Sequence, residues 1–277
     1  MKKEYYYCDL YSDSLIELLK KNNVKYEILD YGTLVPKMVR FTVMEGHSII
    51  TLLPDYSTTK PLITCIYSKK ELLDAEFLTL RPKKWIIDIT NIDDVCEYSC
   101  ERISYGGNLH YGHCTQKGSF TIAPFKGSDK TFFFSESTGC SVLFARKSVA
   151  TVIRKNNITG ILFFPVYQNT KNKEMVEADF WQLLSDEMIY LNNICLDEPE
   201  RIKKCPICGK TKIFNGQGYQ LKLLSEKLAL NQDFYMTEAV FGDGIPCPLF
   251  IVSQKLYRLL KEQHFDKNVT FEPVILI

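Results

Sequence analysis

One string of residues recurs along this 277-residue chain and restricts the folds open to it. At 247–252 an apolar, strand-like segment leads into Ser253; leucines at 256, 259 and 260 then have helical spacing, and Phe271-Glu-Pro-Val closes the unit. A serine before such spacing is typical of a helix N-cap. The same order runs from Cys140 to Phe163-Phe-Pro-Val, offset by 107 residues at the cysteines and 108 at the phenylalanines.

A third, partial copy lies near the start of the chain. Ser12 opens a run of leucines at 15, 18 and 19, and the Lys-Asn-Asn-Val that begins at Lys21 is similar to the Lys-Asn-Asn-Ile that begins at Lys155. Since the copies keep the order of helix and strand, internal duplication explains them better than chance.

Between the copies the pattern is mostly that of strands separated by glycine and proline turns. The expected strands are residues 39–44, 48–53, 62–67, 85–89 and 131–134. Residues 178–191 predict a further helix, because their apolar residues recur at helical spacing. The predicted fold class is therefore α+β: two related units with mixed or antiparallel sheets, each ending in a helix and a strand. The expected divisions are a strand-rich segment with a partial repeat at 1–84, a first repeat unit at 85–170 and a second at 171–277.

The charge balance and the absence of a targeting motif limit the functions that the chain can have. The chain has 34 Lys and Arg against 33 Asp and Glu, which argues against a general polyanion binder. Lys2 and Lys3 are followed by Glu4 and tyrosines instead of an apolar signal segment, and no stretch reaches the ~18 apolar residues of a membrane span. We therefore expect a cytoplasmic protein with no membrane partner, in which ten cysteines stay reduced.

The sharpest motif is Cys205-Pro-Ile-Cys208-Gly, which predicts a zinc knuckle. The spacing lets two thiolates reach one metal, and the glycine lets backbone N–H groups approach the sulfurs. Only basic charges occur between Arg201 and Lys212, and a positive field favours thiolates. A redox pair is the alternative, although such motifs open a helix after a strand, whereas turn-forming residues follow here.

A structural zinc needs four ligands. The repeat offset relates the knuckle to Cys96 and Cys100, so the two pairs could share one zinc. Alternatively each copy could bind its own zinc, with His110, His113 or Cys114 completing the first site. These residues could also be plain loop residues beside a decayed knuckle. The remaining cysteines are expected in the core: Cys8, Cys65, Cys140, Cys195 and Cys247. Cys195, ten residues before the knuckle, could instead be a metal ligand.

Motifs for catalysis are missing from the sequence. It contains no His-Glu-x-x-His, no deaminase signature and no Gly-x-Ser-x-Gly elbow. We therefore expect a structural zinc, no catalytic residues and no enzyme activity. A metalloenzyme that uses His110 or His113 is a third-ranked alternative.

The stretch from Glu174 to Glu200 carries eight acids and no Lys or Arg. One interpretation is a solvated surface that links the copies. The other is a contact surface for a basic partner protein, with aromatic side chains as anchors. The candidate partner-binding residues are Glu174, Glu177, Asp179, Trp181, Asp186, Glu187 and Tyr190.

The second half of the chain resembles a known family. The Cys-x-x-Cys-Gly knuckle, the leucines that follow it, Asp233-Phe-Tyr, the Ser253 helix and the closing Phe-x-Pro-Val look like the double-CxxCG proteins and related immunity proteins of bacterial polymorphic toxin systems. The resemblance covers about 178–277 and, more loosely, 85–166. It implies a cytoplasmic protein that binds and neutralises a cognate toxin by direct contact. The family's second knuckle is also Cys-x-x-Cys-Gly, whereas this chain has Cys96-x-x-x-Cys100.

The alternative function is a zinc-knuckle protein that binds nucleic acid or regulates another protein. The basic residues from Arg201 to Lys212 motivate it. The neighbouring acids oppose phosphate binding, so a nucleic-acid partner is the weaker expectation.

Overall fold

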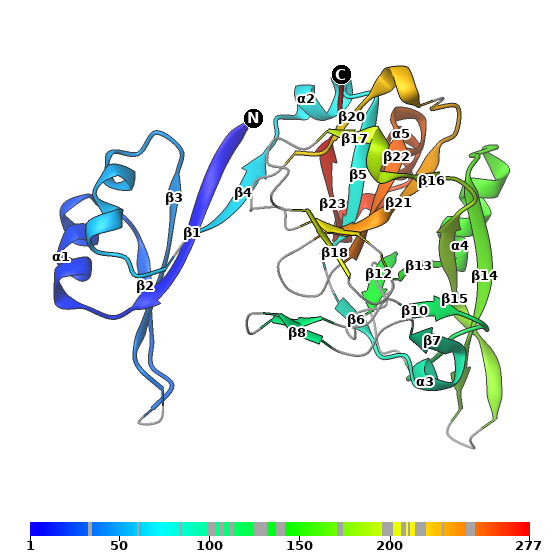
Figure 1. Cartoon of the computed structure of the whole chain (residues 1–277), viewed down its shortest axis with the longest axis horizontal. Helices are drawn as coiled ribbons and strands as arrows, with labels where there is room; N and C mark the ends of the chain where they lie inside the picture. Colours follow the sequence, from blue (N-terminus) through cyan, green and yellow to red (C-terminus); the bar gives the residue numbers. More distant parts are fainter. Residues whose placement is uncertain are drawn as a thin grey trace. The chain divides into compact units, whose positions relative to one another are not determined.

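The computed structural model folds as two units. It describes residues 1–32, 35–59, 61–83, 85–98, 103–105, 108–110, 114–124, 132–136, 142–170, 174–195, 202–205, 209, 211–213, 220–228, 230–241 and 247–277. Contacts divide the chain into a first unit at Met1–Glu71 and a second at Leu72–Gly216 and Gln220–Ile277. Figure 1 draws the first unit in blue shades and the second from cyan to red. Within the described residues, no helix has the length and apolar character needed to cross a membrane.

The first unit is a four-stranded sheet with a helix on one face. Its elements are β1 (Lys2–Leu10), α1 (Asp13–Lys21), β2 (Tyr26–Leu29), β3 (Met38–Met44), η1 (Ser48–Thr51), η2 (Leu53–Asp55) and β4 (Leu62–Ile66). The strands lie in the order β2-β3-β1-β4, and all neighbours are antiparallel. Alternate residues of β1 and β3, such as Tyr7 and Phe41, pack on Leu15 and Leu19 of α1. Helix α2 (Lys69–Asp74) carries the boundary to the second unit.

The second unit is built on two larger sheets. Its elements up to the middle of the chain are β5 (Phe77–Pro82), β6 (Trp85–Ile87), α3 (Ile92–Val95), β7 (Cys96–Tyr98), β8 (Ile103–Tyr105), β9 (Asn108–His110), β10 (Cys114–Gln116), β11 (Thr121–Ile122), β12 (Phe133–Glu136), β13 (Leu143–Arg146), α4 (Lys147–Lys155), β14 (Ile161–Asn169) and β15 (Met175–Ser185). The later elements are β16 (Met188–Ile189), η3 (Leu191–Asn193), β17 (Ile194–Cys195), β18 (Ile202–Lys204), β19 (Thr211–Ile213), β20 (Lys222–Leu223), η5 (Ser225–Lys227), β21 (Phe234–Phe241), β22 (Cys247–Ser253), α5 (Gln254–Glu262), η6 (Phe265–Asn268), β23 (Val269–Pro273) and β24 (Ile275–Leu276).

The two sheets share one apolar core. One sheet has the order β11-β14-β15-β13-β12-β6, and the other has the order β18-β19-β21-β22-β5-β23 with β16 beside β21. Most neighbouring strands are antiparallel, as in β13, β14 and β15. Residues of α4 and α5, including Ile153 and Leu260, pack in the same cluster as Leu183 and Val252. The expected mixed α+β class with mostly antiparallel sheets is therefore confirmed.

Three strand–helix–strand segments share one local design. They are β1-α1-β2, β13-α4-β14 and β22-α5-β23, and each helix has nine residues. In each segment one antiparallel strand lies between the two flanking strands: β3, β15 and β5 respectively. Two residues after each helix the backbone takes a left-handed conformation, at Asn23, Asn157 and His264. Such a residue ends a helix and redirects the chain, so the three helices stop in the same way.

Two expectations about local structure are wrong. Residues 178–191 are not a helix: most of them form β15, a central strand between β14 and β13. Both faces of β15 are covered, so consecutive residues such as Gln182 and Leu183, which point to opposite faces, are both buried. The resulting apolar pattern therefore resembles helical spacing. Residues 48–53 are not a strand either, because η1 and η2 occupy that region and Pro54 lies in η2.

Candidate functional site

The knuckle motif lies between two paired strands, β18 and β19. Strands β18 and β19 are antiparallel and pair Lys204 with Thr211, so residues 205–210 connect them. The Cys205 carbonyl accepts a hydrogen bond from the Gly209 N–H at 2.9 Å, and Gly209 has φ +70°. Because an L residue with a side chain is strained in that conformation, the glycine is needed for the turn. The strand β19 follows the motif at Thr211–Ile213, where turn-forming residues were expected, so that expectation is wrong for these residues. A strand also differs from the helix that a thioredoxin-like redox pair would open.

The expected zinc ligands are only partly covered by the structure. Cys100, His113 and Cys208 lie outside the described residues. Within those it describes, no group of three or more His, Cys, Asp or Glu side chains could hold a metal.

Cys96 does not project from a comparable turn. It begins β7, is 7% exposed and packs in an apolar cluster with Ile89 and Phe120. Cys114 and His110 belong to β10 and β9, which are strands of two separate sheets.

The basic residues around the knuckle do not form one exposed patch. Lys203 and Lys204 are exposed on β18, whereas Lys212 on β19 is buried. Arg201 and Lys210 lie outside the described residues. Lys203 and Lys212 are paired across the two strands and therefore lie on the same face of the sheet. Their exposures differ because β18 is an edge strand, whereas β19 lies between β18 and β21.

Three of the expected partner-binding residues have partners within the chain. Glu177 and Asp179 on β15 form ion pairs of 2.9 Å with Lys147 and Arg146, which lie at the start of α4. The Arg154 guanidinium lies 4.9 Å from the centre of the Trp181 ring. Residues 177, 179 and 181 lie on one face of the strand, because alternate residues of a strand share a face. This period-two spacing was present in the sequence, but the segment was interpreted as a helix.

The other expected partner-binding residues are at the surface too, as are the ion-paired Glu177 and Asp179, whose side chains are 46% and 63% exposed. Asp186 and Glu187 follow the end of β15 and are exposed. Tyr190 comes directly after β16 and is 55% exposed, and Met188 beside it is also exposed. Glu174 is exposed at the other end of β15. Because Ile189 is fully buried, β16 is anchored while its neighbouring side chains face outward.

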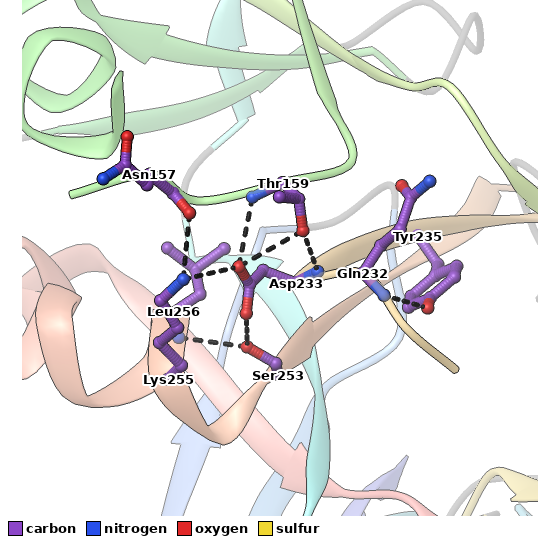
Figure 2. A network of polar contacts seen from close by, with 8 residues as sticks. All are labelled: Asn157, Thr159, Gln232, Asp233, Tyr235, Ser253, Lys255 and Leu256. Atoms are coloured by element: carbon purple, nitrogen blue, oxygen red, sulfur yellow. Dashed lines mark hydrogen bonds and ion pairs between the residues drawn. The ribbon is translucent and has the colours of Figure 1, made fainter. Parts of the chain in front are cut away.

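Asp233 is the centre of a buried polar network, which Figure 2 shows. It is 8% exposed, and its carboxylate accepts hydrogen bonds from the Ser253 hydroxyl at 2.7 Å and the Thr159 N–H at 3.1 Å. Lys255 lies 3.1 Å from the same carboxylate and donates to the Asn157 carbonyl at 2.9 Å. The network therefore ties the end of α4 to the start of α5.

The same serine caps α5. Its hydroxyl oxygen accepts a hydrogen bond from the Leu256 N–H at 3.2 Å while it donates to Asp233. Both contacts hold the helix start in place and occupy the hydroxyl. Sequence reasoning identified the Ser253 cap but not the role of Asp233, because no local pattern connects the two positions.

The surroundings of Asp233 set its protonation. Burial is the largest influence and by itself would raise the pKa. The hydrogen bonds from Ser253 and Thr159 and the charge of Lys255 together outweigh burial, so the pKa lies below its ordinary value. The carboxylate is thus held in its charged form, which suits a structural acceptor.

Comparison with known proteins gives no family for the chain. No protein-family model matches the sequence, and no curated protein matches it either.

Proposed function

We propose that the chain is a cytoplasmic, non-enzymatic immunity-type protein that binds a cognate bacterial toxin and blocks it by direct contact. The resemblance of 178–277 to double-CxxCG and immunity proteins motivates this function. The structural observation that carries it is the exposed group after β15, in which Tyr190 lies near two acids that have no ion-pair partner among the described residues.

That group fits a basic protein surface. Asp186 and Glu187 would supply negative charge, and Tyr190 and Met188 would supply area that becomes buried on binding. Glu177 and Asp179 are expected to contribute less, because each already has a cation beside it, Lys147 and Arg146 respectively. We therefore narrow the acidic contact surface to Asp186, Glu187, Met188 and Tyr190, a set that we call the 186–190 surface.

The purified protein is expected to form a stable 1:1 complex with the product of the neighbouring gene. The change Tyr190→Ala should weaken the complex by about tenfold or more, because a truncated aromatic anchor typically costs over 1 kcal/mol. Asp186→Lys should also weaken the complex, because it reverses a charge on the 186–190 surface. Its control is Glu262→Lys, a charge reversal at an exposed acid on α5, which should leave affinity unchanged. Isothermal titration calorimetry measures all four proteins.

Two outcomes would contradict this function. One is failure of the wild-type chain to bind or protect against that product. The other is tight, salt-sensitive binding of DNA or RNA at low salt, which would favour Lys203 and Lys204 as a phosphate-contacting pair instead.

We further propose that the knuckle binds a structural zinc. Cys205 and Cys208 would be two of its ligands, and the exposed Lys203 and Lys204 favour the thiolate form. The Cys205–Gly209 turn and its hairpin setting support this assignment. A zinc here would hold β18 to β19, which share only three residue pairs.

Metal analysis tests the zinc assignment. The pure protein should contain about one zinc per chain, and Cys205→Ser should lose it. Cys8→Ser, at a half-buried cysteine of the first unit, is the control and should keep it. Loss of zinc in Cys96→Ser as well would identify a site shared between the two pairs, whereas a metal-free, folded wild type would refute the assignment.

We also propose that the segments β13-α4-β14 and β22-α5-β23 are related units that arose by duplication. Their matching sequence order, helix length and left-handed residues Asn157 and His264 support this origin.

A further inference from the structure

Strand β14 has an open edge over half its length. On one side it pairs with β15 from Ile161 to Asn169. On the other side β11 pairs only with Tyr167 and Gln168. Of the strands that the structure describes, none lies along the outer side of Ile161–Pro165, and Figure 1 shows β14 at the outer margin of its unit.

The hydrogen-bond alternation shows which backbone groups face outward. The Gly160 carbonyl accepts from the Asp186 N–H, so the pair 160 and 186 is hydrogen-bonded. In an antiparallel ladder such pairs recur every second residue. The backbone N–H and C=O groups of Leu162 and Phe164 therefore form hydrogen bonds with β15. The N–H and C=O groups of Ile161 and Phe163 therefore point away from β15.

Side chains on both faces of this edge are suited to contact. Leu162 and Phe164 are 43% and 41% exposed on one face. On the other face the Arg154 guanidinium lies 4.7 Å from the centre of the Phe163 ring, and it is exposed. An added strand would meet an apolar surface on one side and a cation on the other.

We propose that an extended segment of the protein partner adds to β14 at Ile161–Pro165 as a further strand. Main-chain hydrogen bonds would provide affinity, and alternate side chains would provide specificity. The segment that fits has apolar residues toward Leu162 and Phe164 and an acid toward Arg154. This inference rests on the proposed function, since the partner is the toxin that the chain is proposed to bind.

A second copy of this chain fits the edge less well. Symmetric antiparallel pairing centred on Phe163 would bring two Arg154 guanidinium groups to the same face with no acid between them, and facing like charges destabilise strand pairs. Pro165 has no N–H and therefore ends the available edge, a common feature of strands that must not pair at random.

The test uses the product of the neighbouring gene as the probe. The double variant Leu162→Lys, Phe164→Lys should weaken its binding by about tenfold or more, because charges replace the buried apolar contacts. Arg154→Glu should also weaken it, and Arg154→Lys should restore most of the affinity. Val176→Lys is the control, since Val176 is exposed on β15 opposite Gln168, where β11 already covers β14.

Hydrogen exchange gives an independent readout. In the free protein the amides of Ile161 and Phe163 should exchange quickly, and in the complex they should become protected. The amides of Leu162 and Phe164 should be protected in both states, because they donate to β15.

The outcomes separate this inference from the proposed function. If the wild type binds but the edge variants bind equally well and the two outward amides stay unprotected, the edge assignment fails and the function stands. If the wild type does not bind, both fail. A wild-type dimer that the double variant converts to a monomer would identify a second copy as the occupant and overturn the proposal.

Discussion

Replacing Asp233 by Ala is expected to lower the free energy of unfolding of the second unit by about 3 kcal/mol. The change leaves the Ser253 hydroxyl and the Thr159 N–H without their acceptor in a site that is 8% exposed. A buried donor without a partner costs about 1–3 kcal/mol, and two such donors are created. Denaturant unfolding followed by circular dichroism measures the change.

Lys255→Met is the matched control for this variant. It removes the charge partner of Asp233 but keeps both buried donors satisfied, and the lysine side chain is 56% exposed. The expected loss is therefore below about 1 kcal/mol. Equal losses in the two variants would show that the ion pair, and not the buried hydrogen bonds, gives the network its strength.

The contribution of Asp233 should depend on pH in one direction. Because its pKa is lower in the folded protein than in the unfolded chain, its stabilising effect is present above the unfolded pKa, about 3.9. The effect disappears as the pH falls through the lower, folded pKa. The stability difference between wild type and Asp233→Asn should therefore narrow below about pH 4, which unfolding curves between neutral and acidic pH can check.

Gly160→Ala is expected to destabilise the second unit by about 3 kcal/mol. Gly160 has φ +85°, and a Cβ built on it would overlap the backbone carbonyl oxygen of Phe234 and the side chain of Gln232. The backbone carbonyl cannot move without disturbing β21, so strain adds to the cost of the left-handed conformation. Thermal or denaturant unfolding of the variant gives the change in free energy.

Gly46→Ala separates the cost of the left-handed backbone conformation from the cost of steric overlap. Gly46 has φ +86°, almost the same conformation, but nothing lies within 4 Å of its Cβ position. Its expected cost is about 1 kcal/mol, the left-handed term alone. If both variants lost the same stability, close packing around Gly160 would not be the cause.

The sequence predicted the helices whose signals are local. Ser12 and Ser253 mark α1 and α5, because a cap and an apolar stripe need only neighbours along the chain. β15 was missed because its pattern depends on what covers it: Gln182 is buried by a reciprocal amide pair with Gln116, 66 residues away. No residue near 182 carries that information.

The candidate site was predictable to a smaller degree. The knuckle motif did not predict the two strands around it, β18 and β19, between which Gly209 takes a left-handed conformation. The acidic residues were found by composition, but which of them have an ion-pair partner follows from the fold. Glu177 and Asp179 meet α4 only because β15 lies beside β13, whose end leads directly into that helix.

The position of β5 has a consequence for synthesis. This strand, at Phe77–Pro82, lies between β22 and β23, so it reaches its partners only after Val269–Pro273 has left the ribosome. The first unit has no such requirement, because all of its paired strands lie within the first 66 residues. The first unit can therefore fold during translation, whereas the seven-stranded sheet must wait for almost two hundred further residues. During that interval β5 is exposed to wrong partners, so we expect the second unit to be more prone to misfolding during synthesis than the first.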